Sequence, residues 1–332
     1  MKNIKQKSLS DLAKKEDYGD RKGYTQNFIT SSVKLSLPDF AGVKNLFKAS
    51  IKKGSDFEIP YYNFSVVLHK KRKFPLLAAC NIDGKAFVDT ARKNSWRDDP
   101  RAEKYSWGAN LYEAKKSDFD KGHMVAREYP AWGAGHDAAF KADQDTFHYT
   151  NSVPQVHKLN GGIWRELEVN VLHNGAKGTK QRVNLFIGPV LDINDPVFIT
   201  KVNNEDIQVP NLFWKVIVWN KKGKGLHAVG FVMSQENFLI KDGLVRKTKK
   251  IKAATTDDFF ENITFKDKKT YQVPISFIEE ITGINFSWKN VTFPYKENKA
   301  IEMKSTRSDK LGIAGVSRGA KRPKKIITNM VL

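Results

Sequence analysis

The chain has 332 residues, of which 40% are hydrophobic, which suits a globular protein with a large core and excludes a chain disordered along its length. Its 57 Lys and Arg residues outnumber 36 Asp and Glu residues, and the net charge of +21 favours a polyanionic partner, either nucleic acid or an anionic membrane surface. The single cysteine, Cys80, excludes an intrachain disulfide and a Cys-rich zinc site, and its apolar neighbours predict a buried thiol.

The amino terminus and the hydropathy pattern bear on localisation. Residues 1–7 lead into charged sequence without the apolar segment of a secretory signal peptide. No apolar run approaches the ~20 residues that span a bilayer. We therefore expect a soluble protein without a membrane span, cytoplasmic by default, with export by another route left open.

The order of segment types predicts a central domain with an extension at each end. Residues 1–55 are polar and basic, and residues 288–332 become basic again, as solvated tails do. Between them, over 56–287, the apolar runs predict strands at 61–68, 75–82, 183–190, 212–219 and 226–232, and a short amphipathic helix at 275–283. Strands neighbour one another more than they alternate with helices, which indicates an α+β fold.

The middle of the central domain carries the most informative motif. Residues 108–151 are rich in loop-forming residues and contain the run Asp118–Met124, where we expect His123 at a strand end or in a hairpin. A helix is then predicted to open at Pro154-Gln155 and to stop at Gly175, with apolar residues recurring at Ile163, Trp164, Leu167 and Val171. Gly161-Gly162 weakens its first turn, and the conformational cost of that pair suggests a purpose.

These residue types suit the hydrolysis of phosphodiesters. A neutral imidazole such as His123 can take a proton from water, and the amide oxygen of Asn160 can bind a hard cation such as Mg²⁺, which needs few protein ligands. Glu168 lies eight residues further along the helix, roughly 12 Å along its axis. That distance is too long for one ion and suits a carboxylate that holds water near the metal. Trp164 lies between them and is assigned to packing.

The run Asp120-Lys121-Gly122-His123 resembles the Asp-Arg-Gly-His motif of the DNA/RNA non-specific endonucleases. This is the ββα-metal (His-Me finger) family, which includes proteins like endonuclease G. The family's second block is matched in order and spacing by Asn151, Pro154-Gln155, Asn160, Trp164 and Glu168. The similarity spans roughly residues 58–287, about two thirds of the chain.

The resemblance implies a fold and an activity. The fold is a mixed, mainly antiparallel β-sheet core flanked by helices, with a ββα-metal motif at the active site. The activity is that of a metal-dependent, sugar-non-specific endonuclease acting on DNA and RNA, with His123 as general base. Asn160 is then the sole direct protein ligand to Mg²⁺, for which Mn²⁺ can substitute. A homodimer is common in the family and is left open here.

The remaining site residues follow from the same resemblance. The family has an upstream arginine near the phosphate, and Arg92 fits it best by its position before Ser95-Trp96, with Arg97 second. Lys121 replaces the motif's arginine as a substrate contact, keeping the charge and losing the planar fork. We expect Asp120 to orient the site and Asn151 to position it. No basic residue follows Glu168 by one helical turn, where Leu172 stands.

Two other classes of protein share part of this pattern. A catalytically inactive nucleic-acid-binding module would have the same charge and fold, and would bind DNA in a salt-dependent way without turnover. A nuclease toxin would have the same chemistry and would need a cognate inhibitor protein as partner. A zinc site is disfavoured, because four histidines match no usual ligand spacing: His136, His148, His157 and His173.

Overall fold

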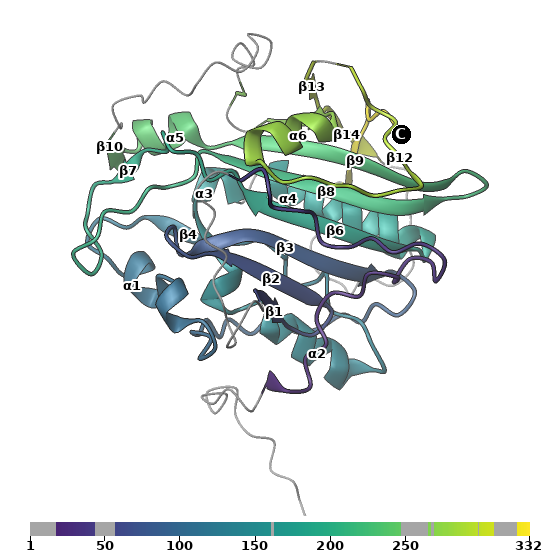
Figure 1. The fold of residues 1–332 in the computed structure, drawn as a ribbon, viewed down its shortest axis with the longest axis horizontal. Helices are drawn as coiled ribbons and strands as arrows, with labels where there is room; N and C mark the ends of the chain where they lie inside the picture. Colours follow the sequence, from purple (N-terminus) through teal and green to yellow (C-terminus); the bar gives the residue numbers. More distant parts are fainter. Residues whose placement is uncertain are drawn as a thin grey trace, which may run out of the picture.

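The computed structural model describes residues 18–43, 57–160, 163–246, 265–266, 269–297, 299–308 and 324–332. Its centre is a nine-stranded sheet (Figure 1). In spatial order, eight of its strands are β1 (Glu58–Pro60), β2 (Phe64–His69), β3 (Phe74–Asp83), β6 (Arg182–Pro189), β8 (Leu212–Lys221), β9 (Gly225–Ser234), β11 (Thr270–Val273) and β13 (Ile301–Glu302). These pair antiparallel, and β12 (Val291–Thr292) adds a parallel pair beside β9. The sheet is therefore mixed and mainly antiparallel, as predicted.

In the described residues, three two-stranded sheets and six short α-helices surround this core. The small sheets pair β4 (Phe119–His123) with β5 (Ser152–Val156), β7 (Val197–Phe198) with β10 (Val245–Arg246), and β14 (Ser305–Ser308) with β15 (Lys324–Ile327). The helices are α1 (Gly108–Tyr112), α2 (His136–Asp145), α3 (His157–Asn160), α4 (Ile163–Val169), α5 (Glu236–Lys241) and α6 (Ile275–Thr282). Helix α4 continues into a π-helical segment, Asn170–Lys177, and 3-10 turns lie at Glu103–Tyr105 and Tyr149–Asn151. Within the described parts of the chain, no helix has the length and apolar character needed to cross a bilayer.

The sheet separates two apolar cores, and β8 shows how its sequence serves both. Phe213 and Ile217 belong to the core that contains the side chains of α4. Trp214, Val216 and Val218 belong to the opposite core, which contains the side chains of α6. This alternation follows from the two-residue repeat of a strand. Figure 1 shows α4 behind the sheet, and α6 with residues 18–43 in front of it.

The predicted strands and the closing helix are confirmed, and one helix start is wrong. Pro154 and Gln155 were expected to open the helix, but they lie in β5, where they pair with Lys121 and Asp120 of β4. A proline is tolerated in such a two-stranded ribbon, and the helix begins at His157, after the pairing ends. Gly161-Gly162 lies outside the described residues. Cys80 is fully buried, as expected.

The described parts of both extensions pack on the large sheet. Leu35 and Phe40 are buried in the core with α6, and the indole nitrogen of Trp288 donates a hydrogen bond to the Ser36 carbonyl oxygen at 2.8 Å. At the carboxyl end, the side chain of Gln272 donates to the backbone oxygen of Val331 at 2.8 Å and accepts from its nitrogen at 2.9 Å. The basic residues 318–323 lie outside the described residues. The domain limits at 56 and 287 stay predictions.

Candidate active site

Strands β4 and β5 and the helix α3 that follows them form the frame of the site. Asp120 pairs with Gln155 and His123 with Ser152, so that Asp118–Met124 runs into a hairpin-like ribbon as expected. Gly122 is required by this pairing, because a Cβ atom there would lie 2.3 Å from the Gln155 side chain. The antiparallel pair followed by a helix brings Asp120, His123 and Asn160 to one place.

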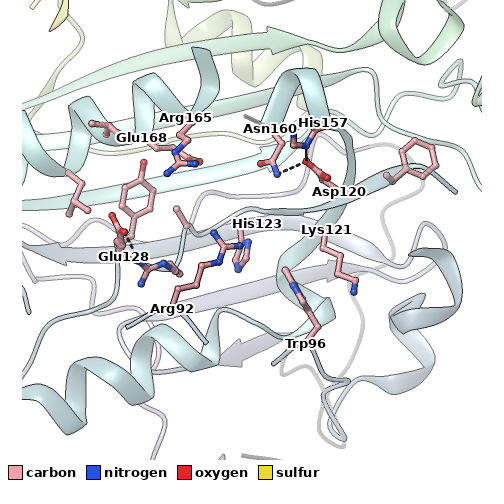
Figure 2. Close-up of a pocket in the computed structure, with 16 residues that line it drawn as sticks. Arg92, Trp96, Asp120, Lys121, His123, Glu128, His157, Asn160, Arg165 and Glu168 are labelled. Atoms are coloured by element: carbon pink, nitrogen blue, oxygen red, sulfur yellow. Dashed lines mark hydrogen bonds and ion pairs between the residues drawn. The ribbon is translucent and has the colours of Figure 1, made fainter. Parts of the chain in front are cut away.

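A cleft of about 670 Å³ opens over this frame. It brings together six of the eight predicted site residues, which are Arg92, Asp120, Lys121, His123, Asn160 and Glu168. Figure 2 shows these six around one space, with Arg92 reaching toward His123. The other two, Arg97 and Asn151, do not line the cleft.

Asp120 fixes the orientation of the Asn160 amide. The Asn160 side-chain nitrogen donates to Asp120 Oδ2 at 3.0 Å, and His157 Nδ1 lies 3.0 Å from the same oxygen (Figure 2). An ionised carboxylate only accepts hydrogen bonds, so the amide nitrogen must face Asp120, which turns the amide oxygen of Asn160 away from it. That oxygen is a suitable ligand for a hard cation such as Mg²⁺. No cluster of three or more His, Cys, Asp or Glu side chains suited to a metal occurs in the part of the chain that the structure describes.

His123 packs against two aromatic rings that also contact each other, and it is neutral. Its ring centroid lies 4.5 Å from that of Trp96 and 5.0 Å from that of Phe147. Burial lowers the pKa of His123 to about 3, and the positive charges of Arg92 and Arg127 add to this effect. Its Nε2 atom is buried and has no hydrogen-bond partner among the described residues. The imidazole is therefore unprotonated near pH 7, as a general base must be.

The cleft carries an excess of cationic side chains. Arg92 is exposed, and its Nε donates to Asn94 Oδ1 at 2.8 Å, which leaves its two terminal nitrogens without a protein partner in the described structure. Arg127 instead bonds Asp143 Oδ2 and Glu128 Oε1, each at 2.7 Å. Of Arg92 and Arg127, Arg92 is thus the one whose planar fork is open to a phosphate group. Lys121 and Arg165 also line the cleft.

Arg97 and Asn151 support the site from outside the cleft. Each side-chain nitrogen of Arg97 donates to a protein group, Nε to His148 Nε2 at 3.1 Å, Nη1 to the Ser95 oxygen at 3.1 Å and Nη2 to the Gln144 oxygen at 2.9 Å. The second phosphate contact expected at Arg97 therefore finds no geometric support. The fully buried Asn151 accepts from Val125 N and donates to Val125 O, both at 3.0 Å, which fixes the turn after His123.

Glu168 has a partner that the motif did not reveal. Its Oε1 atom accepts a hydrogen bond from Lys215 Nζ at 2.9 Å, and Lys215 is fully buried. The signal was present in the sequence, because Lys215 is the charged residue in the apolar run 212–219, at a position that alternates with Phe213 and Ile217. Trp96 was also missed as the ring that covers His123. Trp164, expected to pack, is 1% exposed.

The sequence of the chain matches a known family over most of its length. The family model of the DNA/RNA non-specific endonucleases matches residues 43–292. The chain belongs to this family. An uncharacterized protein of Sinorhizobium fredii, y4fB, is 30% identical over 285 residues, which are 81% of this chain and 39% of that protein.

Other relatives carry an established name. Mitochondrial endonuclease G of Homo sapiens is 28% identical over 148 residues, which are 43% of this chain and 47% of that protein. The endonuclease G of Bos taurus is 30% identical over 123 residues, 35% of this chain and 38% of that protein. The chain thus spans less than half the length of these curated relatives. Among solved structures, an EndoG/EndoGI complex described as showing the mechanism of EndoG inhibition is similar at a TM-score of 0.49 and 19% identity, over 73% of this chain and 91% of that one.

Proposed function

We propose that the protein is a metal-dependent, sugar-non-specific endonuclease that hydrolyses phosphodiester bonds of DNA and RNA. One observation carries this proposal. A neutral histidine, an amide held in one orientation by a carboxylate and an arginine with an open fork line the same cleft, as His123, Asn160 and Arg92. Membership of the family and the net charge of +21 support nucleic acid as the substrate.

Each of these three residues has a distinct role in the proposed reaction. His123 takes the proton from the attacking water. Asn160 offers its amide oxygen to Mg²⁺, or to Mn²⁺ in its place, and the bound ion would neutralise charge on the phosphorane and the leaving oxygen. Arg92 grips the phosphoryl oxygens through its terminal nitrogens.

The other predicted residues act around this centre. Asp120 orients Asn160, Asn151 fixes the turn behind His123, and Glu168 holds water at the far end of the cleft. Lys121 contacts the substrate as a point charge, and in this proposal Arg97 supports the fold of the site. A homodimer and a cognate inhibitor protein stay predictions.

The test is an incubation of the purified protein with supercoiled plasmid and with total RNA, in Mg²⁺ and in EDTA, beside His123→Ala. The expected result is cleavage of both polymers in Mg²⁺, none in EDTA, and a fall of roughly 10²–10⁴-fold in the variant with DNA affinity retained. His157→Ala is the matched control, because His157 is an exposed histidine of the same cleft. A gel shift without cleavage in any metal would instead support the inactive binding module.

A further inference from the structure

Lys215 is a charged residue in a place built for apolar ones. It lies in the middle of β8 with no exposed surface, on the same face of the sheet as Phe213 and Ile217. Its Nζ atom lies 3.7 Å from the centroid of the Trp164 ring and 5.9 Å from that of Tyr129. Removing an ammonium group from water is costly, so a lysine at this position requires a specific compensation.

The compensation comes from one carboxylate, which lines the cleft. Lys215 Nζ donates to Glu168 Oε1 at 2.9 Å, and burial lowers the pKa of Lys215 while the Glu168 charge opposes that change. The Glu168 side chain is 19% exposed, and the structure records no protein partner for its second oxygen among the described residues. One carboxylate oxygen of Glu168 is therefore held by Lys215 of the large sheet, and the other is available to groups in the cleft.

Two buried donors beside this ion pair need water. The Tyr129 hydroxyl and the Trp164 indole nitrogen are buried and have no hydrogen-bond partner among the described residues. Tyr129 lines the cleft, and the Glu168 charge adds to burial in raising its pKa well above the usual value. Buried polar groups of this kind are satisfied by ordered water. At the Glu168 end of the cleft, the Tyr129 hydroxyl is thus a polar group that water can satisfy.

We propose that Lys215 is a positioning residue, which holds Glu168 in one rotamer with one carboxylate oxygen so that the other oxygen orders water in the cleft. This inference rests on the proposed nuclease activity and deepens it. Lys215 touches neither substrate nor metal, and it acts through Glu168 alone. It follows that the effect of removing Lys215 must disappear once Glu168 no longer carries a carboxylate.

The first test is Lys215→Met, which keeps the unbranched side chain up to its fourth heavy atom and removes the charged donor group. The kcat for a defined oligonucleotide should fall by about 10–100-fold, as for other groups that orient a reacting site from behind. KM and the affinity for DNA in EDTA should stay within about twofold, since no substrate contact is lost. Lys221→Met, at the end of the same strand, is the control and should leave kcat unchanged. A wild-type kcat in Lys215→Met would overturn the proposal.

The second test is a double-mutant cycle with Glu168→Gln. If Lys215 acts through Glu168, the double variant should cleave no more slowly than Glu168→Gln alone, whereas independent roles would multiply the two losses. Multiplied losses would overturn the proposal. If the methionine variant does not fold, Lys215→Gln takes its place in the cycle. It should lower kcat less than Lys215→Met, and this loss should again disappear when Glu168→Gln is also present. Retained cleavage in His123→Ala would contradict the proposed function itself, which separates the two failures.

Discussion

At the scale of single residues, Asp120 decides which atom of Asn160 faces the cleft. Asp120→Ala removes the acceptor of the Asn160 amide, which can then rotate. We expect kcat to fall by about 10–100-fold and the Mg²⁺ concentration for half-maximal activity to rise, as when other groups that orient a metal ligand are removed. His157→Ala removes the other partner of Asp120 and should change either quantity less than twofold. Equal losses in the two variants would contradict the orienting role.

Arg92 and Arg97, the two candidates for the arginine that binds the phosphate, differ in their hydrogen-bond partners. Arg92→Lys should lower kcat by about 10–100-fold and hardly change the melting temperature, because it removes an open planar fork and one exposed hydrogen bond to Asn94. Arg97→Lys should lower the melting temperature, because Arg97 donates to His148, Ser95 and Gln144. Thermal melts and single-turnover cleavage of both variants check this. A melting temperature lowered by Arg92→Lys and not by Arg97→Lys would reverse the assignment.

Sequence spacing identified six of the sixteen residues that line the cleft, and it missed Lys215 and Trp96, which hold Glu168 and His123. Five of these six residues belong to the motif and to the block that follows it, and Arg92 lies upstream of both. Lys215 and Trp96 were missed because their partners, Glu168 and His123, lie 47 and 27 residues away in the chain, and such pairs form only through the fold. Burial at Lys215 was visible in the alternation of its strand, but the carboxylate that pairs with it was not.

At the scale of elements, Gly122 and Gln155 show how tightly β4 and β5 are matched. Gly122→Ala places a Cβ atom 2.3 Å from the Gln155 side chain, so the ribbon must shift. We expect a loss of about 1–3 kcal/mol in the free energy of unfolding, as in other overpacked sites, together with a fall in kcat. The amide of Gln155 is buried with neither atom partnered among the described residues.

The same element offers a rescue experiment. Adding Gln155→Ala to Gly122→Ala removes the side chain with which the new Cβ atom clashes. The double variant should recover part of the free energy of unfolding and part of kcat. Gln155→Ala alone is the control, and urea unfolding with cleavage rates provides the measurement. No recovery in the double variant would show that the glycine is required by the backbone rather than by the Gln155 side chain.

The start of the helix after β5 was mispredicted because strand pairing is not local. Pro154-Gln155 before an apolar period resembles a helix start in the sequence, but β5 pairs over its whole length with β4, 28 residues earlier in the chain. The strands of the large sheet were easier to predict, since their apolar runs are long and separated by turns. Neither the apolar runs nor the pattern of a helix start shows which strands pair with each other.

At the scale of the whole molecule, polar contacts join residues 18–43 to the folded domain, and the composition of this segment does not predict them. The Tyr18 hydroxyl donates to His148 Nε2 at 2.8 Å, and Arg21 Nε donates to the buried Asp145 Oδ2 at 3.2 Å. The polar, basic composition of this segment predicts an extension. Its buried partners, His148 and Asp145, lie over 120 residues further along the chain, so the composition does not reveal that the segment folds back. The sequence therefore predicted the strands of the large sheet and did not predict this docking.

His148 makes stability depend on pH in a predictable direction. Its Nε2 accepts from Tyr18 and Arg97, and its Nδ1–H donates to the Asp145 carbonyl oxygen at 2.8 Å, so the ring has no site for a second proton. Burial lowers the pKa of His148 to about 3 from 6.5. Below pH 6.5 the unfolded chain binds the proton and the folded one does not, so stability is lost as pH falls toward 3. The loss is about 2 kcal/mol between pH 6.5 and 5.

His148→Gln tests this contribution, because glutamine keeps an acceptor and does not titrate. The free energy of unfolding of the variant should fall less steeply between pH 6.5 and 5, by about 1.4 kcal/mol per pH unit. Asp195, whose pKa burial raises to about 7, contributes a slope of opposite sign, and it cancels in the difference between the two proteins. Parallel curves for wild type and variant would contradict the assignment of His148.

Chemical rescue of His123→Ala with imidazole tests directly whether His123 is the general base. Removing the ring leaves a space beside Trp96 and Phe147, whose centroids lie 4.5 and 5.0 Å from that of the native imidazole. If His123 is the general base, cleavage in Mg²⁺ should be restored in proportion to the concentration of neutral imidazole, while Asn160→Ala should not be rescued. Wild-type cleavage by His123→Ala, or equal rescue of both variants, would contradict it.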